Sequence, residues 1–254
     1  MAQADRAAII TGASSSIGIG AAIARRLAGL GWRLFLTADG PAEGLEAVAA
    51  ECRALGAPAV ATHLADLGEP AAPAAMVEAA LLAHGRVDAL VNNAGLRLNR
   101  PFGDFSAADF DRMMAVNLRA AFLASQAVLP AMRRQGGGRI LHVASQFGSV
   151  ASPGRALYGM TKAALIHLTR TMAMELSREN IQVNAISPGP VATAPLLAQE
   201  QANPAEARER RSYLPVGRLG EPDEIAEVAA MLLTLKGGFL VGHDLVVDGG
   251  FSIH

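Results

Sequence analysis

The stretch A-A-I-I-T-G-A-S-S-S-I-G-I-G-A-A-I-A-R-R-L-A-G-L, residues 7–30, decides the fold. It begins with a short apolar run, 7–11, that has the character of a buried strand. After a glycine-rich turn, Ile23, Leu27 and Leu30 recur at the spacing of a helix face. Glycines let a backbone approach a phosphate closely, and the N-terminus of the next helix supplies unpaired N–H groups. The stretch therefore predicts a phosphate-binding strand–turn–helix unit.

The remainder of the chain alternates strand-like and helix-like segments. Further strands are predicted over 32–37, 58–63, 88–91, 139–144, 181–186 and 245–247, and helices over 41–55, 73–84, 107–134, 156–177 and 221–235. This alternation is typical of an α/β fold in which helices cover both faces of a parallel sheet. We expect one doubly wound, Rossmann-type domain over residues 1–254, with about seven strands flanked by helices.

Residues 192–214 differ from their surroundings, because they are rich in polar and charged residues and show no clear core pattern. A segment of this length without a core pattern is more often a functional loop than a second domain. We interpret about residues 190–215 as a substrate loop that covers a site.

Composition limits the partners of the chain. Its 254 residues are 51% hydrophobic and carry a formal net charge of -1, which argues against nucleic acid or an anionic membrane as a partner. Cys52 is the single cysteine, so no disulfide can form within the chain. No apolar run approaches the roughly 20 residues of a membrane span, and the N-terminus has no signal-peptide pattern. We expect a cytoplasmic protein with no metal site.

Asp39 follows the predicted second strand, in the segment T-A-D-G-P-A-E over 37–43. In a dinucleotide-binding fold, an acid about 20 residues past the glycines binds the ribose 2′-OH and repels a 2′-phosphate. Asp39 has this separation from Gly18 and Gly20, and the segment contains no arginine or lysine. An ordinary aspartate in a turn is the alternative interpretation. The pattern favours NAD as the cofactor, with NADP as the alternative.

Tyr158 and Lys162 are four residues apart in a predicted helix, so their side chains share one face, with Cβ atoms roughly 5–6 Å apart. A free phenol has a pKa of about 10, and a nearby cation lowers it. Such a phenol can give a proton to a carbonyl oxygen or take one from an alcohol. Ser145 ends the predicted fifth strand thirteen residues earlier. Taken alone, each of these features is common in helices and strands that have no catalytic role.

Several motifs that occur together and in order favour a catalytic role for these residues. They are T-G-A-S-S-S-I-G-I-G at 11–20, Asp66, N-N-A-G at 92–95, Asn117, Ser145, Y-G-M-T-K at 158–162, P-G-P-V-A-T at 188–193 and V-D-G-G at 247–250. With these motifs the chain resembles the short-chain dehydrogenase/reductase family over essentially its whole length. The resemblance implies a catalytic tetrad of Asn117, Ser145, Tyr158 and Lys162, hydride transfer between a nicotinamide cofactor and a carbonyl or secondary alcohol, and a homotetramer.

The resemblance also implies a set of cofactor contacts. Besides Asp39, Tyr158 and Lys162, the set comprises Gly12, Ser14, Ser15, Ser16, Ile17, Gly18, Ile19, Gly20, Asp66, Leu67, Asn93, Ala94, Gly95, Pro188, Gly189, Val191 and Thr193. The family turn runs T-G-x-x-x-G-x-G, whereas Ser16 stands at the middle-glycine position when counted from Thr11. Counting back from the helix instead makes Gly18 and Gly20 the last two glycines of a turn two residues longer, and we prefer this frame.

The substrate is not readable from the motifs. Expected pocket residues are Leu96, Leu98, Gln146, Phe147, Arg155, Leu196 and Leu197. The main alternative activity is that of a 3-oxoacyl-carrier-protein reductase, in which Arg133, Arg134 and Arg178 would dock an acidic carrier; these arginines are otherwise ordinary solvated charges. A non-catalytic nucleotide-binding relative is disfavoured because all four tetrad residues are present. A sugar-nucleotide epimerase is disfavoured because the chain lacks the length for an added substrate domain.

Overall fold

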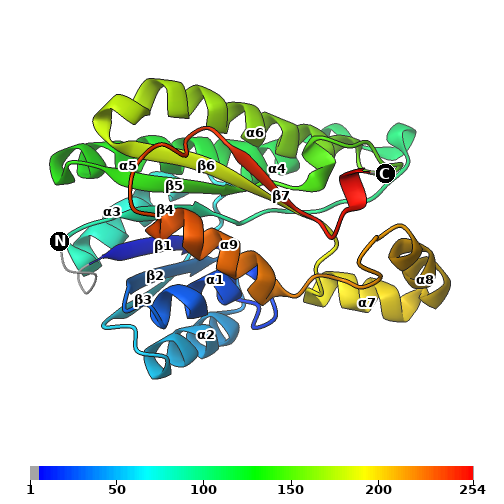
Figure 1. Cartoon of the computed structure of the whole chain (residues 1–254), viewed down its shortest axis with the longest axis horizontal. Coiled ribbons are helices and arrows are strands. Elements are labelled where there is room, and N and C mark those ends of the chain that lie inside the picture. The colour runs from blue at the N-terminus through cyan, green and yellow to red at the C-terminus, as the bar shows by residue number, and fades with distance from the viewer. Residues whose placement is uncertain (1–5, 254) are drawn as a thin grey trace.

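A seven-stranded parallel sheet runs through the computed structural model, which describes residues 6–253. The strand order is β3-β2-β1-β4-β5-β6-β7, so the direction of winding reverses between β1 and β4 (Figure 1). The strands are β1 (Ala7–Thr11), β2 (Arg33–Ala38), β3 (Val60–Leu64), β4 (Ala89–Asn92), β5 (Gly138–Val143), β6 (Ile181–Pro188) and β7 (Asp244–Val247). The predicted fold class is confirmed.

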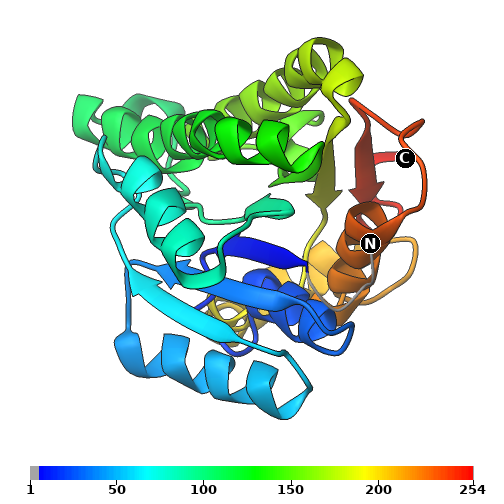
Figure 2. The ribbon, with the colours of Figure 1, turned by 90° about the vertical axis from the view of Figure 1, so that its left-hand side faces the viewer.

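Helices cover both faces of the sheet, as Figures 1 and 2 show. One face carries α1 (Ile19–Ala28), α2 (Ala42–Ala54) and α9 (Pro222–Thr234). The other carries α3 (Ala72–His84), α5 (Ala120–Gln135) and α6 (Ala156–Leu176), with α4 (Ala107–Met114) leading into α5. Because neither face is open to water, the central strands β1 and β4 are buried at every position. This explains why they read as continuous apolar runs instead of alternating ones.

Two hydrophobic clusters hold the layers together. Leu27 of α1 and Trp32 belong to the cluster beneath α1, α2 and α9. Met76 of α3 and Met132 of α5 belong to the cluster on the opposite face. All four side chains are almost fully buried, and each buried side chain of this size stabilises the fold by about 1.5–3 kcal/mol. The sheet is therefore held from both sides, and its carboxyl edge is left for other contacts.

The predicted long helix over 107–134 contains an irregular turn. The chain forms α4, then a π-helical turn over Ala115–Arg119, then α5. Gly136, with φ 79°, ends α5 in the left-handed conformation that glycine adopts without strain. Isolated π turns interrupt helices mostly at functional positions, and this one contains the predicted tetrad residue Asn117.

The segment 192–214, which was interpreted as part of a substrate loop, contains helices that the sequence pattern did not predict. It contains two helices, α7 (Ala194–Ala202) and α8 (Pro204–Ser212), which lie beyond the carboxyl edge of the sheet (Figure 1). Proline stands in the first turn of each helix, where its missing N–H costs nothing, and the Asn203 side chain caps α8 by accepting from Glu206 N at 3.2 Å. Few apolar residues contribute, so helical periodicity is absent from the sequence.

No helix within residues 6–253 has both the length and the hydropathy that crossing a bilayer requires.

Candidate active site

A cavity of about 790 Å³ opens at the carboxyl edge of the sheet, near the reversal between β1 and β4. Ligands of open α/β sheets bind at this kind of position. The cavity extends from the glycine-rich turn, past the end of β5, to the α7–α8 pair. The predicted site residues that line it are Gly12, Ser15, Gly18, Ile19, Asn93, Gly95, Ser145, Tyr158, Lys162, Pro188, Gly189, Val191 and Thr193.

A smaller cavity of about 100 Å³ adjoins the first, because Gly12, Gly95 and Leu96 line both. It brings together four of the predicted cofactor contacts, namely Asp39, Asp66, Leu67 and Ala94. Asp39 is exposed at the end of β2. The Asp66 carboxylate is already bonded to Arg112 Nη1 at 2.9 and 3.0 Å and to Gly68 N at 2.9 Å. The Arg112 bond lowers the pKa of Asp66 below its usual value.

The predicted residues that line neither cavity are Ser14, Ser16, Ile17, Gly20 and Asn117. Ser14 is used within the protein, because its Oγ donates to Gly40 O at 2.6 Å. Ser16 and Ile17 are exposed on the outer side of the turn. The turn therefore presents Ser15, but not Ser16, to the cavity.

The glycine-rich turn has the backbone geometry that a bound pyrophosphate requires. A Cβ added at Gly20 would lie 2.5 Å from Gly12 O, so only glycine permits this approach of α1 to β1. Gly12 itself has φ +69°, and a Cβ added there would lie 2.9 Å from Ala94 Cα. Gly18 is the N-cap of α1, no side chain caps that end, and its first turn contains no acid. The N–H groups there are free for an anion, so the residues fit a dinucleotide, with Gly18 and Gly20 as the last two glycines.

Thr11 and Asn93 join the end of β4 to this turn. Thr11 Oγ1 accepts from the backbone N–H groups of Asn93 and Ala94, both at 2.9 Å. Asn93 Nδ2 donates to Thr11 O at 2.7 Å and to Gly12 O at 3.0 Å. The two strands at the reversal point are thereby fixed relative to each other.

Ser145 and Tyr158 meet on the opposite wall. Ser145 caps a short 3₁₀ turn, and its Oγ accepts from Phe147 N at 3.2 Å, which leaves the hydroxyl hydrogen available to donate. Enclosure by the cavity walls raises the pKa of Tyr158, whereas the Ser145 hydroxyl and the guanidinium groups of Arg97 and Arg155 act in the lowering direction. The phenol is therefore protonated at neutral pH in this arrangement.

Lys162 is almost fully buried, and its Nζ donates to Val143 O at 2.7 Å. Burial lowers the pKa of this ammonium to about 8. Its Nζ lies 5.6 Å from the centre of the Tyr158 ring, as expected for residues four apart on a helix. The cations that lower the pKa of Tyr158 in this structure are Arg97 and Arg155, which the sequence motifs did not single out for this effect.

Asn117 lies behind the cavity wall. Its Oδ1 accepts from Leu96 N at 2.7 Å, and its Nδ2 donates to Leu96 O at 2.9 Å and to Thr161 Oγ1 at 3.1 Å. A Cβ added at Gly95 would lie 3.5 Å from Asn117 Oδ1 and 3.6 Å from Lys162 Nζ. The amide and the ammonium therefore face the same small volume above Gly95.

A buried polar network under the site went unpredicted. Asn92 Nδ2 donates to Ser125 Oγ at 3.1 Å, Ser125 Oγ contacts His142 Nε2 at 3.5 Å, and His142 Nδ1 contacts Thr169 Oγ1 at 2.9 Å. Because Thr169 Oγ1 donates to Leu165 O, Nδ1 must carry the imidazole proton. Burial, with the nearby Lys162 charge, lowers the pKa of His142 to about 4. The imidazole is therefore a neutral link between β5 and α6.

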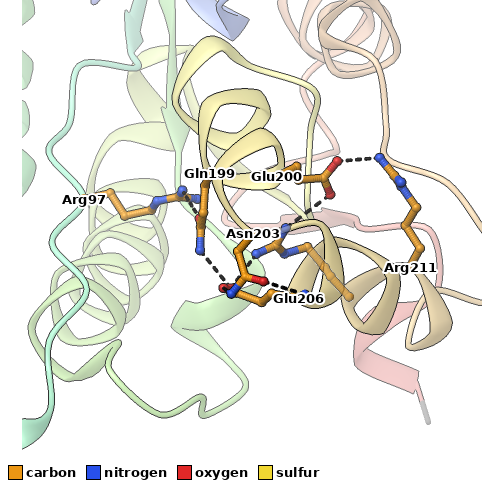
Figure 3. A network of polar contacts seen from close by, with 7 residues as sticks. Arg97, Gln199, Glu200, Asn203, Glu206 and Arg211 are labelled. Carbon is orange, nitrogen blue, oxygen red and sulfur yellow. Dashed lines mark hydrogen bonds and ion pairs between the residues drawn. The ribbon is translucent and has the colours of Figure 1, made fainter.

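Charged residues of the α7–α8 pair form a second unpredicted feature (Figure 3). Arg97 Nη2 donates to Gln199 Oε1 at 3.3 Å, and Gln199 Nε2 donates to Glu206 Oε1 at 2.8 Å. Arg210 bonds Glu206 at 2.8 Å and the buried Glu200 at 3.2 Å, and Arg211 also pairs with Glu200. The network ties α7 to α8 and both to the wall that follows β4.

The remaining lining residues complete the substrate side of the cavity. Of the expected pocket residues, Leu96, Gln146, Phe147, Arg155 and Leu196 line it, and Leu98 and Leu197 do not. Lining residues that the sequence did not indicate include Arg97, Asn99, Glu206, Glu209, Arg210, Tyr213 and Phe251. For the four of these that lie within 192–214, the signal was the high charge of that segment. Within residues 6–253, no group of His, Cys, Asp and Glu side chains is placed to hold a metal ion.

Comparison with known proteins gives the class. A family model described as "Enoyl-(Acyl carrier protein) reductase" matches residues 12–252. A cyclopentanol dehydrogenase of Comamonas testosteroni is 35% identical over 248 residues, covering 98% of this chain and 97% of that protein. The solved structure of a short-chain dehydrogenase/reductase from Serratia marcescens is 36% identical with a TM-score of 0.91, covering 99% of this chain and 100% of that one.

A structure from Beutenbergia cavernae, described as a putative NAD(P)-dependent gluconate 5-dehydrogenase with NADP bound at low occupancy, is 34% identical with a TM-score of 0.91, covering 99% of this chain and 98% of that one. The fold and site define an NAD(P)-dependent oxidoreductase that acts on CH–OH and C=O groups. The chain belongs to the short-chain dehydrogenase/reductase family.

The buried His142 predicts how stability depends on pH. The folded pKa of about 4 lies below the ordinary value of 6.5, so the unfolded chain binds this proton first as the pH falls. The contribution to stability is complete above pH 6.5 and is lost towards pH 4, by about 3 kcal/mol in total at about 1.36 kcal/mol per pKa unit. The free energy of unfolding in urea, measured across this range, should fall less steeply in His142→Gln than in the wild type.

His167→Gln is the control, because His167 is exposed on the outer face of α6. It should follow the wild-type profile. Parallel profiles for His142→Gln and the wild type would contradict a neutral, buried His142.

Proposed function

We propose that Asn117, Ser145, Tyr158 and Lys162 form the catalytic tetrad of this oxidoreductase. The observation that supports it is the convergence of Ser145, Tyr158 and Lys162 on one cavity that continues to the glycine-rich turn. When bound, NAD(P) supplies or accepts the hydride. The residues that would hold it are Gly12, Ser15, Gly18, Ile19 and Asn93 in the larger cavity, with Asp39, Asp66, Leu67 and Ala94 at the adenosine end.

Tyr158 moves the proton. In reduction its hydroxyl gives a proton to the substrate oxygen, and in oxidation the phenolate takes the proton from the alcohol. Ser145 donates a hydrogen bond to the same oxygen and so stabilises the negative charge that develops there. Its own Oγ is oriented by the Phe147 N–H, which supports this assignment.

Lys162 and Asn117 assist the proton transfer by Tyr158. In this proposal the Lys162 ammonium adds its charge to those of Arg97 and Arg155 in stabilising the phenolate, and it would hold the nicotinamide ribose. Asn117 Oδ1 faces the volume above Gly95 that Lys162 Nζ also faces. A water bound between the two would connect the ammonium to solvent and return the proton.

The substrate is a ketone or a secondary alcohol, as in the relative named for cyclopentanol. The alternative of a carrier-protein substrate gains nothing from the arginines at the ends of α5 and α6. Arg133 is paired with Glu179, and within one chain these arginines lie at the amino edge of the sheet, opposite the cavity.

The chain is expected to assemble as a cytoplasmic homotetramer. Phe122 on α5 and Met174 on α6 are 43% and 85% exposed, and large exposed apolar surfaces mark sites of contact between proteins. Alanines around them allow close approach of a second subunit. Cys52 is free and buried, and a single unpaired cysteine suits a reducing compartment.

Tyr158→Phe tests the catalytic assignment. Only the proton transfer is removed, so turnover across a panel of ketones and secondary alcohols should fall by roughly 10²–10⁴-fold while cofactor affinity is retained. Tyr213→Phe, which changes the other tyrosine of the chain, should reduce turnover far less. Near-normal turnover in Tyr158→Phe would refute the assignment.

Asp39 predicts the cofactor preference. The wild type should use NAD with roughly 10- to 100-fold higher kcat/KM than NADP. The Asp39 carboxylate would repel a 2′-phosphate that has no cation to pair with in residues 37–43, and screening by salt at this exposed position limits the size of the effect. Asp39→Ala should bring the two values together, and Asp111→Ala, exposed on α4, should not. A wild type that prefers NADP, or a ratio unchanged in Asp39→Ala, would show that Asp39 is not the selector.

The assembly is tested by light scattering. At micromolar concentration the particle should have four times the mass of one chain, and Phe122→Glu should shift it to smaller species because the charge would be buried in the interface. A monomeric wild type would contradict the homotetramer.

A further inference from the structure

The wall of the cavity between Tyr158 and the α7–α8 pair is rich in guanidinium groups. The charged residues lining the cavity are Arg97, Arg155, Lys162 and Arg210 against Glu206 and Glu209. Lys162 is bonded into the end of β5 and belongs to the tetrad. Arg97 and Arg155 act on the pKa of Tyr158, but none of the three arginines has yet been given a role in binding the substrate.

The carboxylates of this wall already have partners. Glu206 bonds Arg210 and Gln199, both at 2.8 Å. Glu209 accepts from the Tyr213 hydroxyl at 3.2 Å. Arg210 is thus neutralised by Glu206 and Glu200.

Arg97 and Arg155 are left without a carboxylate. Among residues 6–253, the side chain of Arg97 bonds only the neutral amide of Gln199, at 3.3 Å. Arg155 forms no side-chain hydrogen bond or ion pair with these residues, and its Nη1 is buried without an acceptor. Leaving a buried guanidinium N–H unpaired is unfavourable, so this position requires an acceptor from elsewhere.

Packing fixes the Arg155 guanidinium in the cavity wall. Arg155 is the N-cap of α6, three residues before Tyr158. Its Cζ lies 5.6 Å from the centre of the Phe147 ring, a cation–π distance. Phe147 in turn packs edge-to-face on Phe251, with the ring centres 6.2 Å apart. The guanidinium is held in the wall of the cavity that Tyr158 also lines.

The two arginines also repel each other. Burial lowers the pKa of both, and the Arg97 charge lowers that of Arg155 further. Both act electrostatically on the Tyr158 phenol, which places them near the atom that exchanges the proton. Like charges held together in a cleft bind an anion more strongly than either would alone.

We propose that the substrate carries a carboxylate, which Arg97 and Arg155 bind while its carbonyl or hydroxyl group lies at Ser145 and Tyr158. The substrate is then an oxo acid or a hydroxy acid; this inference rests on the proposed function. Guanidinium groups match the planar carboxylate with paired N–H donors. A phosphate, with nearly two charges, would be repelled more strongly by Glu206 and Glu209 on the same wall.

Binding to the protein loaded with NADH tests the anion site without turnover. The probes are monocarboxylates from propionate to octanoate, their primary amides, inorganic phosphate and methyl phosphate, titrated by calorimetry. The best carboxylate should bind at least about 10-fold more tightly than its amide, because one partner of an enclosed charge pair is lost in the amide. Phosphates should bind more weakly than that carboxylate.

Arg155→Met should abolish the preference for the carboxylate over the amide, and Arg155→Lys should retain part of it. NADH affinity should be unchanged in both, which shows that the fold is intact. Arg134→Met, which removes an exposed arginine at the far end of α5, should behave as the wild type. Equal binding of acids and amides, a preference unchanged in Arg155→Met, or tighter binding of phosphate would overturn the proposal.

Turnover separates this proposal from the proposed function. Hydroxy acids should be oxidised with higher kcat/KM than their methyl esters, and Arg155→Met should remove that difference mainly through KM. If neutral alcohols are oxidised equally well in a Tyr158-dependent reaction, the carboxylate proposal fails and the oxidoreductase assignment stands. If carboxylates bind through Arg155 but no alcohol or ketone reacts, the tetrad assignment fails instead.

Discussion

The buried ammonium of Lys162 is the constraint on which the site depends. An isolated charge in a protein interior is strongly unfavourable, and the Lys162 ammonium donates to the Val143 carbonyl oxygen at 2.7 Å. That carbonyl is available because β5 ends there. Lys162 therefore fixes the height of α6 above the sheet, and with it the position of Tyr158 one helical turn earlier. Burial and, to a smaller extent, the same charge lower the pKa of the neutral His142, which directly precedes Val143.

The π turn between α4 and α5 places a second polar group, the amide of Asn117, near that ammonium. In a regular α-helix, the direction of the Asn117 side chain would follow the 3.6-residue repeat. The π turn over Ala115–Arg119 shifts the repeat at this residue, and the amide then bonds Leu96 and Thr161 while facing the volume that Lys162 faces. The segment after β4 is fastened by the same amide, so one side chain positions two walls of the cavity.

Most of the fold could be predicted from the sequence, for a physical reason. Strands buried on both faces are continuously apolar, as in 7–11, and the helices that cover them show one apolar stripe. The strand β1, the helix α1 and the strands and helices that follow are therefore recognisable from local patterns. The sequence also predicted that the glycine-rich turn, Ser145 and Tyr158 lie close together, since parallel strands place their carboxyl ends at one edge of the sheet. The motifs added the order of these elements, which periodicity alone does not supply.

The parts that could not be predicted depend on contacts between polar groups distant in sequence. The α7 and α8 helices are held by ion pairs such as Arg210–Glu200 instead of an apolar face, so a hydrophobic pattern does not mark them. The His142 network joins four elements through single hydroxyls and one amide. No sequence signal marked Arg97, because the residue that its side chain bonds, Gln199, lies about one hundred positions later.

Arg97 and Arg155 would act in both substrate binding and proton transfer. Their charge lowers the pKa of Tyr158 in opposition to burial, which raises it, so the balance depends on how much of that charge is neutralised. An anion bound between Arg97 and Arg155 would cancel part of the lowering effect and keep the phenol protonated, as reduction requires. Departure of the anion would restore the full charge, which favours loss of the proton. The same two guanidinium groups would then recognise the substrate and adjust the acidity of the group that reacts with it.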